Sequence, residues 1–512
     1  MDQICNDCGA KHWKGELPAQ CTSNNKFWMS CCKAGAVKVD FLTDPPAFIK
    51  DLYDDVGSRG QTFKNNLRRY NAAFAFTSLG CQIRDRNVSN MPFQIQGQMY
   101  HSQGPLLAGH NTQPKYVQLY ILDPQYAASV RSLNNNELDR EIIEGLTTVL
   151  NECNPHVSLY KSAYELLMSS TEPDSFVRIF PSMGIELVAG SDRRTENLPT
   201  SNEVAGIIPN ESSSRSFRDI RLYLRSNPGN ENPYTTISQN HALYMPLHYT
   251  LLFPNGDLGW NWGLRLSNDQ NARLTHRCYY RFRLHQRSNE YPIIFMSKRL
   301  FQQYLVDVWA VCDQNKLDWI KAHQSNIRAD LYNGLQDALI QEDVNLTALG
   351  RRYILPSSYT GGPRFMAKQY QDSMAIVRHF GKPSLFITFT ANPRWVEIQR
   401  ELLPGQNASD RPDLVARVFD LKVKELLNDL KRKNIFGTYR GLLRTIEYQK
   451  RGLSHLHLLL FLNPAENFDT AEKIYQVISA EIPSRENDPE LLEIVTKNMV
   501  HGPCGDINPN SP

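Results

Sequence analysis

Hydrophobic and polar positions change their spacing several times along the 512 residues, and each change predicts a different element. FQIQGQMYH (93–101) and YVQLYIL (116–122) alternate like half-buried segments, which predicts antiparallel strands. ELDREIIEGLTTVLNE (137–152) has apolar residues at helical spacing and predicts an amphipathic helix. The region between residues 71 and 208 therefore predicts an α+β module.

A longer helical stripe follows at residues 297–324. It begins after Ser297, a residue type that often precedes the first turn of a helix. The apolar members recur at helical spacing, which predicts an ordinary buried face. These members are Leu300, Phe301, Tyr304, Leu305, Val308 and Trp309.

In the last third of the chain, strand-like and helix-like runs follow one another in a different order. LFITFTANPRW (385–395) is β-branched and aromatic, and LVARVFDLKVKELLNDLKRK (414–433) is helical in its spacing. Two strand-like runs at 441–452 and 453–462 come next, followed by a second helix-like run at 469–482. This order predicts an antiparallel sheet backed by helices.

Composition narrows the class of protein. Lys and Arg number 56 against 53 Asp and Glu, so the net charge of +3 does not by itself indicate a nucleic-acid binder. No apolar run of signal-peptide length opens the chain, and no uninterrupted apolar run reaches roughly 18 residues. We therefore expect a folded protein of a reducing, intracellular compartment that is neither secreted nor membrane-spanning.

Five of the ten cysteines crowd into the first 32 residues: Cys5, Cys8, Cys21, Cys31 and Cys32. In a reducing compartment, Cys-x-x-Cys followed by a second cysteine cluster indicates a tetrahedral zinc site rather than disulfides. Cys5 and Cys8 would supply one half, and Cys31 or Cys32 would supply the other. The fourth ligand would be Cys21 or His12, and the spacing leaves that choice open. A set of reduced thiols without metal is the alternative.

Two histidines stand two residues apart in the run LSHLHLLLFL (453–462). Because side chains alternate along a strand, His455 and His457 share one face with Cα atoms about 7 Å apart, while the intervening leucine faces the core. Both imidazoles can reach one divalent cation, and Glu447 or Gln449 on the preceding strand would complete an open site. Such a cation could act as a Lewis acid on a phosphodiester. Taken alone, H-x-H often arises by accident among ordinary core or surface histidines.

Ordered blocks of the sequence resemble Helitron-type transposases, whose replication-initiator domain belongs to the HUH endonucleases. The most specific blocks are LFITFTANPRWVEI (385–398), EYQKRGLSHLHLLLFL (447–462) and MVHGPCG (499–505). Further blocks, from CNDCGAKHWKGE (5–16) to LGRRYILPSSYTGGPRFM (349–366), extend the resemblance over nearly the whole chain.

The resemblance implies an HUH-type domain with a ferredoxin-like palm. In that family the two histidines, matched by His455 and His457, hold Mg²⁺ or Mn²⁺, and a tyrosine on a later helix attacks the DNA to form a 5′-phosphotyrosine link. Single-stranded DNA would be the partner, for rolling-circle nicking and strand transfer in the nucleus. Lys450 and Arg451 would hold phosphate beside the metal, with a solvated basic turn as the alternative.

A second candidate for DNA contact is the run YYRFRLHQR (279–287). Its basic residues, Arg281 and Arg283 among them, could bind phosphates, and its aromatic rings could stack on bases. A charged structural helix or strand is the alternative.

The sequence departs from the family pattern toward its C-terminus. Helitron transposases carry a tyrosine pair beyond the HGPCG block and continue into a helicase, whereas the 512 residues contain neither that pair nor a G-x-x-x-x-G-K-[ST] phosphate loop. Tyr475 is the single tyrosine after His457, and its neighbours Ile474, Val477 and Ile478 predict a helix core residue rather than a nucleophile. We therefore expect the N-terminal part of a transposase without its nucleophile. The helicase region of a full-length relative would be a further partner. The alternative is a non-catalytic DNA-binding protein of transposon origin.

Polar breaks rich in Gly, Asn and Ser at 191–203, 209–216 and 225–236 predict long loops or domain joints. Four parts follow from these breaks and from the blocks above. They are a Cys-rich zinc module (1–45), an α+β DNA-binding-type module (46–210), a region of linker strands and helices (211–350) and an HUH endonuclease-like domain (351–512) that is incomplete at its C-terminus.

Overall fold

The computed structural model describes residues 1–18, 21, 27–83, 95–102, 113–168, 205–206, 220–224, 234–323, 355–449, 452–479 and 481–500. Helices are mixed with small two- and three-stranded sheets, and the predicted α+β class is confirmed. The chain divides into two compact units. Unit 1 comprises Met1–Phe365, Thr390–Lys422 and Tyr448–His455, and unit 2 comprises Met366–Phe389, Val423–Glu447 and Leu456–Pro512. The four-part division inferred from the polar breaks stays a prediction.

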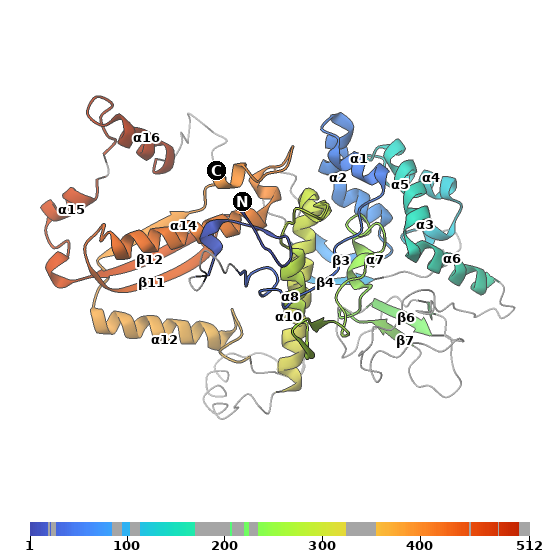
Figure 1. Ribbon diagram of the computed structural model, residues 1–512, viewed down its shortest axis with the longest axis horizontal. Helices are drawn as coiled ribbons and strands as arrows, with labels where there is room; N and C mark the ends of the chain where they lie inside the picture. The colour runs from blue at the N-terminus through green and yellow to red at the C-terminus, as the bar shows by residue number, and fades with distance from the viewer. Residues whose placement is uncertain are drawn as a thin grey trace, which may run out of the picture. The chain divides into compact units, whose positions relative to one another are not determined.

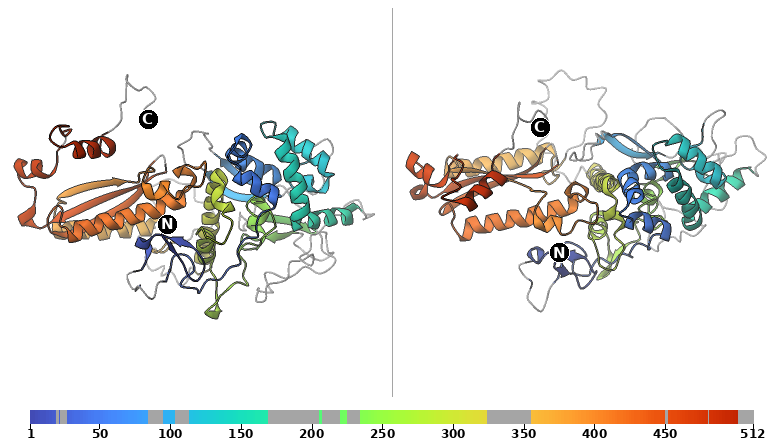
Figure 2. Two further views of the ribbon diagram at one scale, coloured as in Figure 1. Left: turned by 45° about the horizontal axis from the view of Figure 1, so that its top comes forward. Right: turned by 90° about the horizontal axis from the view of Figure 1, so that it is seen from above.

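Unit 1 holds one large core built mainly by helices. Helices α1 to α6 gather together, and the long helix α10 packs against α2 and α8 (Figures 1 and 2). The helices are α1 (Ala47–Asp54), α2 (Ser58–Phe74), α3 (Gln118–Ile121), α4 (Pro124–Asn134), α5 (Arg140–Cys153), α6 (Pro155–Met168), α7 (Tyr244–His248), α8 (His276–Arg283), α9 (Ile293–Met296), α10 (Lys298–Ala322) and α13 (Val396–Gln399), with 3₁₀ turns η1 (Lys14–Glu16) and η4 (Ala408–Asp410).

Short antiparallel pairings complete unit 1. The hairpin of β3 and β4 pairs Ser78 with Ser102 and Leu79 with His101. The remaining strands form pairs β1–β2 and β8–β9 and the three-stranded order β5-β6-β7. The strands are β1 (Gln3–Ile4), β2 (Lys11–His12), β3 (Ser78–Ile83), β4 (Ile95–Ser102), β5 (Ala205–Gly206), β6 (Ile220–Leu224), β7 (Tyr234–Ile237), β8 (Arg265–Leu266) and β9 (Asp269–Arg273).

A buried polar network ties β4 to α10 in the middle of this core. His101 Nε2 lies 2.7 Å from Asp307 Oδ2, and both side chains are fully buried. The Tyr249 hydroxyl donates to the same carboxylate oxygen at 2.9 Å. The His101 ring stacks between Tyr244 and His248, each 4.4 Å away between ring centroids. A buried carboxylate is stable only when it is paired in this way, so the network fixes the register of α10 against the sheet.

The helix expected at 137–152 is present as α5, and the strand expected at 93–101 corresponds to β4. The strand expected at 116–122 was wrong, because this run forms the short helix α3. Val117 and Tyr120 are both fully buried, and Tyr120 donates to the Phe74 carbonyl at 2.5 Å and stacks on Phe76. Two buried residues three positions apart fit one face of a helix, while the alternation of the run also fits a strand. Burial of Val117 and Tyr120 in this core favours the helix.

Helix α10 follows the predicted stripe with one exception. Leu300, Phe301, Tyr304 and Val308 are buried, whereas Trp309 is 68% exposed. The assignment of Trp309 to the core was therefore wrong. A helix packed through one face buries a limited stripe, and Trp309 lies one position, or about 100°, beyond its centre at Val308.

Unit 2 is built around the three-stranded sheet β10-β12-β11. Ser384 N donates to Leu460 O and Ala391 N to Ser454 O, so β10 runs antiparallel to β12, and β11 joins β12 through a hairpin closed by Gln449 N and Leu453 O. The long helices α12 and α14 lie along the sheet (Figures 1 and 2). Helix α14 matches the helix expected at 414–433, whereas sequence reasoning expected no helix where α12 lies. The elements are α12 (Pro363–Phe380), β10 (Leu385–Thr390), α14 (Pro412–Arg432), β11 (Tyr439–Tyr448), β12 (Ser454–Leu462), η5 (Pro464–Glu466), α15 (Ala471–Val477) and α16 (Pro489–Asn498).

One end of the sheet is closed by an aromatic cap. Phe380, the last residue of α12, contacts the ring of Phe461 at 5.9 Å between centroids. Gly441 lies directly beneath it, and a Cβ at this position would come within 2.8 Å of the Phe380 ring. The other end of the same face lacks this cover, and there β12 presents its histidines.

Helix α15 does not bury its apolar residues. Tyr475 is 78% exposed, and Ile474, Val477 and Ile478 are each at least 40% exposed. The interpretation of Tyr475 as a helix core residue was therefore wrong. A helix of seven residues has few turns with which to form an apolar stripe, and it stays exposed unless another element packs on it.

Among the described residues, no helix combines the length and the apolar character needed to cross a lipid bilayer.

Three buried histidines of unit 1 predict how its stability depends on pH. Burial lowers the pKa of His156 to about 4 and the pKa values of His248 and His276 to about 3. The unfolded chain takes up these protons near pH 6.5, so the stability of unit 1 is fully present above that pH and falls as the pH is lowered toward the folded pKa values. When the pH is lowered from 7 to 5.5, each histidine should lower the free energy of unfolding by about 1 kcal/mol, measured by denaturant unfolding.

The matched variants are His276→Gln and His379→Gln. Removing the buried His276 should make this pH dependence shallower by about 1 kcal/mol, whereas removing the exposed His379 should leave it unchanged. Equal pH dependence in wild type and His276→Gln would contradict the assignment.

Candidate metal centres

Four cysteine side chains converge near the N-terminus. The thiols of Cys5, Cys8, Cys31 and Cys32 are buried and lie within 4.8 Å of one another. Cys5 Sγ is 3.7 Å from Cys32 Sγ, and Cys31 Sγ is 3.8 Å from Cys32 Sγ. Four sulfur atoms at about 2.3 Å from a tetrahedral zinc ion are separated by about 3.8 Å, so the cluster fits that ion.

Two tight turns present these thiols. After the first pair, Gly9 has a φ of 70° and donates its N–H to Cys5 O, while Cys5 N donates to Ala10 O, both at 2.8 Å. After the second pair, the backbone turns through Gly35, whose φ is 79° and whose N–H donates to Cys32 Sγ at 3.3 Å. Backbone N–H groups aimed at sulfur favour thiolates, as a metal ligand requires.

The thiols of the cluster differ in pKa because they contact one another. Hydrogen bonds from Cys31 and then Cys32 hold the pKa of Cys8 well below its ordinary value. Contact with Cys32 and then Cys5 raises the pKa of Cys31 well above it. Four crowded thiols thus hold their protons unequally, and a divalent cation would release them together.

Some of the zinc ligands predicted from the sequence lie in this cluster, and others do not. The structure brings together Cys5, Cys8 and both members of the 31–32 pair, so either member expected alone is joined by the other. Cys21 is not in the cluster, and its Sγ contacts the N–H and carbonyl of Phe27. His12 is also elsewhere: its ring stacks on Trp28 at 4.1 Å, and Nδ1 lies 3.0 Å from Glu16 Oε2. The buried four-cysteine cluster could hold a metal such as zinc.

An arginine that sequence reasoning missed supports this cluster. Arg287 is buried, donates from Nε to Cys8 O at 3.0 Å, and places Nη2 3.9 Å from Cys8 Sγ. Its guanidinium lies over the Phe282 ring at 3.6 Å. A guanidinium beside a thiolate offsets negative charge and orients the ligand. The spacing of Arg287 from the cysteines in sequence gave no signal of this role.

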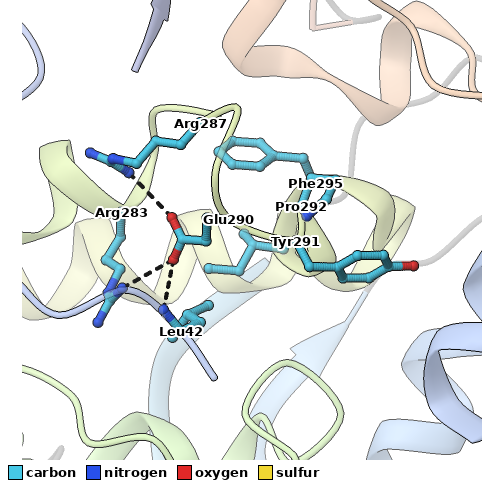
Figure 3. Close-up of a pocket in the computed structure, with 8 residues that line it drawn as sticks. Leu42, Arg283, Arg287, Glu290, Tyr291, Pro292 and Phe295 are labelled. Carbon is cyan, nitrogen blue, oxygen red and sulfur yellow. Dashed lines mark hydrogen bonds and ion pairs between the residues drawn. The ribbon is translucent and has the colours of Figure 1, made fainter. Parts of the chain in front are cut away.

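A carboxylate holds this arginine in place. Glu290 accepts from Leu42 N at 2.8 Å and pairs with Arg283 at 3.3 Å and Arg287 at 3.6 Å (Figure 3). The small cavity beside them has a volume of about 10 Å³, which admits about one water molecule and no larger ligand. This cluster is structural support for the cysteine site.

The N-terminal segment is fixed a second time through Glu16. Its carboxylate forms a two-pronged pair with Arg417, from Nε to Oε1 and from Nη2 to Oε2, each at 2.7 Å. Burial alone would raise the pKa of Glu16, but hydrogen bonds from Arg417 and His12 outweigh it and hold that pKa well below its usual range. The first 16 residues therefore belong to the core of unit 1.

The basic run at 279–287 is largely occupied by such internal contacts. Arg281 donates to the carbonyls of Ser30 and Met29 at 3.2 Å, and Arg283 is buried against Glu290. These two side chains contact the protein itself, and their predicted role in DNA binding stays a prediction. Lys450 and Arg451 lie outside the described residues.

Strand β12 carries the second candidate centre. Leu456 and Leu458 are fully buried, as expected, and the alternating His455 and His457 are half-buried on the opposite face. His455 Nδ1 lies 2.7 Å from the hydroxyl of Thr390 on β10. Sequence reasoning assigned no role to Thr390, although this residue occurs in the run LFITFTANPRW.

The neighbours of His457 complete the description. Glu447 Oε2 lies 3.4 Å from His457 Nε2, and the Phe386 ring stacks on the imidazole with centroids 5.4 Å apart and planes within 10°. Two adjacent ligands of an octahedral cation at about 2.1 Å lie roughly 3.0 Å apart, so Glu447 and His457 fit with a small adjustment. Gln449 closes the hairpin through its backbone, and no side-chain contact between Gln449 and either histidine is recorded among the described residues. Of the two expected third ligands, Glu447 is the one beside a histidine.

Comparison with known families gives this arrangement its context. Residues 279–460 match the family described as the Helitron helicase-like domain at the N-terminus. No curated protein matches the chain. This match supports a Helitron-type N-terminal region over residues 279–460, confirms the Helitron resemblance for that part of the sequence, and suggests a transposase-related function that involves DNA. The matched residues include His455 and His457 of β12 and also Arg287.

The cysteine centre predicts both metal content and the effect of its supporting arginine. Purified protein should carry about one zinc ion per chain by elemental analysis. Arg287→Gln should keep that stoichiometry but lower zinc affinity by roughly tenfold or more in a chelator competition, because the charge beside Cys8 is lost.

Arg281→Gln is the matched control, since Arg281 also binds the backbone of the N-terminal segment but contacts oxygen atoms rather than sulfur. Its zinc affinity should stay near that of wild type. A folded, metal-free protein with reactive thiols would overturn the zinc assignment.

Proposed function

We propose that this protein binds single-stranded DNA and a divalent cation in the nicking and strand-transfer stage of rolling-circle transposition, in the nucleus. His455, His457 and Glu447 hold Mg²⁺ or Mn²⁺, and the cysteine cluster holds structural zinc. The observation that carries the proposal is the pairing of Glu447 with His457, because it brings a carboxylate to the exposed face of a two-histidine strand within the Helitron-like region. Imidazole with carboxylate is a donor set that Mn²⁺ accepts well, while Mg²⁺ prefers oxygen.

The chain's own residues prepare this site. Thr390 fixes the ring of His455 through Nδ1, which assigns Nε2 to the cation. Glu447 supplies negative charge beside His457. When bound, the cation would act as a Lewis acid toward a phosphodiester oxygen. Because the histidines are half-buried and Glu447 is 66% exposed, a DNA strand can reach the site from solvent.

The first prediction of this proposal concerns Mn²⁺. The double variant His455→Ala/His457→Ala should lose Mn²⁺ binding, measured by calorimetry or by the relaxation of water protons, and should keep its zinc content, because thiolates hold zinc independently of imidazoles. Thr390→Val should weaken Mn²⁺ binding by roughly tenfold, since removing a partner that orients a ligand typically has this effect.

Thr388→Val is the control for Thr390, because Thr388 is exposed two residues earlier on the same strand. It should leave Mn²⁺ affinity unchanged. If the histidine double variant binds Mn²⁺ as wild type does, the site lies elsewhere and the proposed function loses its basis.

The second prediction concerns covalent chemistry. We expect the 512-residue chain to bind single-stranded DNA without forming a covalent adduct. Tyr475 is exposed, but among the described residues no general base lies within hydrogen-bond reach of its hydroxyl, and a tyrosine hydroxyl is a weak nucleophile without such activation. Incubation with single-stranded DNA and Mn²⁺, followed by denaturing electrophoresis, measures this.

A slower-migrating protein–DNA species that disappears in Tyr475→Phe would identify Tyr475 as the nucleophile and contradict the expectation. Its absence, with Mn²⁺-dependent DNA binding intact, would agree with a role in which this chain recognises DNA without joining to it, as in a DNA-binding protein of transposon origin.

A further inference from the structure

Phe386 is a large aromatic residue in an unusual position. It lies on β10 directly after the buried Leu385, and it is 62% exposed. Its ring stacks on His457, with centroids 5.4 Å apart and planes within 10°. One face of the ring is therefore covered by an imidazole of the candidate cation site, and most of the rest is open to solvent.

The surroundings of Phe386 do not form an apolar patch. By strand alternation it shares its face with Thr388 and Thr390, and β12 contributes His455, His457, Leu459 and Phe461 to that face. Phe461 is buried and Leu459 is half-buried, so Phe386 is the exposed aromatic ring among the described residues of these two strands on this face. A protein partner would require a contiguous hydrophobic surface, which one exposed ring beside hydroxyl, imidazole and carboxylate groups does not supply. An isolated exposed ring beside a phosphate-binding site is how proteins hold single-stranded nucleic acids, because every base offers a flat face for stacking.

We propose that Phe386 is a stacking platform for one base of single-stranded DNA, next to the phosphate that a cation at His457 and Glu447 would hold. This inference rests on the proposed function and adds to it a base subsite that tolerates any sequence. The base stacks on the open part of the Phe386 ring and so sets which phosphate of the strand lies at the cation.

The test uses the full chain with Mn²⁺ and a short oligothymidine series in which a single abasic position is moved along the strand. One position should weaken binding to wild type by about tenfold, because a stacked base is lost there. Phe386→Leu should bind the intact strand about tenfold more weakly and should no longer distinguish that abasic position. Phe386→Tyr should behave as wild type, because it keeps the aromatic face.

Tyr448→Leu is the matched control. Tyr448 is also an exposed aromatic residue, at 71%, but it alternates with Glu447 on β11 and so belongs to the opposite face of the sheet. This variant should bind the intact and abasic strands as wild type does. An equal loss in Tyr448→Leu would overturn the assignment to Phe386.

A second measurement separates stacking on DNA from support of His457. Mn²⁺ affinity without DNA should be unchanged in Phe386→Leu. If that affinity falls and the abasic position is still distinguished, Phe386 only positions His457, and the inference is wrong. If wild type binds neither Mn²⁺ nor single-stranded DNA, the proposed function fails and the base subsite fails with it. If wild type binds both and Phe386→Leu is indistinguishable from it, the base subsite alone fails.

Discussion

The alternation of side chains along β12 is the constraint on which the candidate DNA site depends. Leu456, Leu458 and Leu460 are almost fully buried, and their burial fixes the register of the strand, because a slip of one residue would expose all three. The same register leaves His455 and His457 together on the opposite face. The hydrophobic core therefore places the two imidazoles, and the neighbouring strands need to supply only their orientation. Thr390 provides it from β10, and Glu447 provides it from β11.

The cysteine cluster bears on the stability of the N-terminal segment. Among its described residues, the first 40 residues of the chain form only two short strands and one 3₁₀ turn, and a metal commonly supplies folding energy in segments with so little regular structure. Here the segment is not an independent module, because Arg287 contacts Cys8 and Arg417 pairs with Glu16. Both arginines lie within the Helitron-like residues 279–460. A metal bound by the four thiols would therefore stabilise the family domain itself as well as the N-terminal segment.

The spacing of residues along the sequence predicted those helices, strands and side-chain clusters that depend on residues close together in sequence. The helices α5, α10 and α14, the strands of the C-terminal sheet and the convergence of the N-terminal cysteines all follow from periodicity or from short motifs. Trp309 and Tyr475 were assigned to the core wrongly, because an apolar residue at helical spacing is buried only if another element covers its face. Thr390, Phe386 and Arg287 acquire their roles through partners 65, 71 and 279 residues away in sequence, and no local pattern carries that information.

The two proposed metal sites differ in their ligand atoms and should therefore prefer different metals. The four buried cysteines would form a soft, closed set of ligands, which suits a metal such as zinc and would leave no coordination position for a substrate. The proposed set of two half-buried imidazoles with one exposed carboxylate is open, and it would bind Mn²⁺ or Mg²⁺ weakly and leave positions for phosphate oxygens. Zinc can also bind imidazole, so an excess of zinc would compete at the open site while the cysteine site is already filled. The weakness of the open site is thus compatible with its role, because a cation that must share its ligands with DNA is held tightly only when the DNA is present.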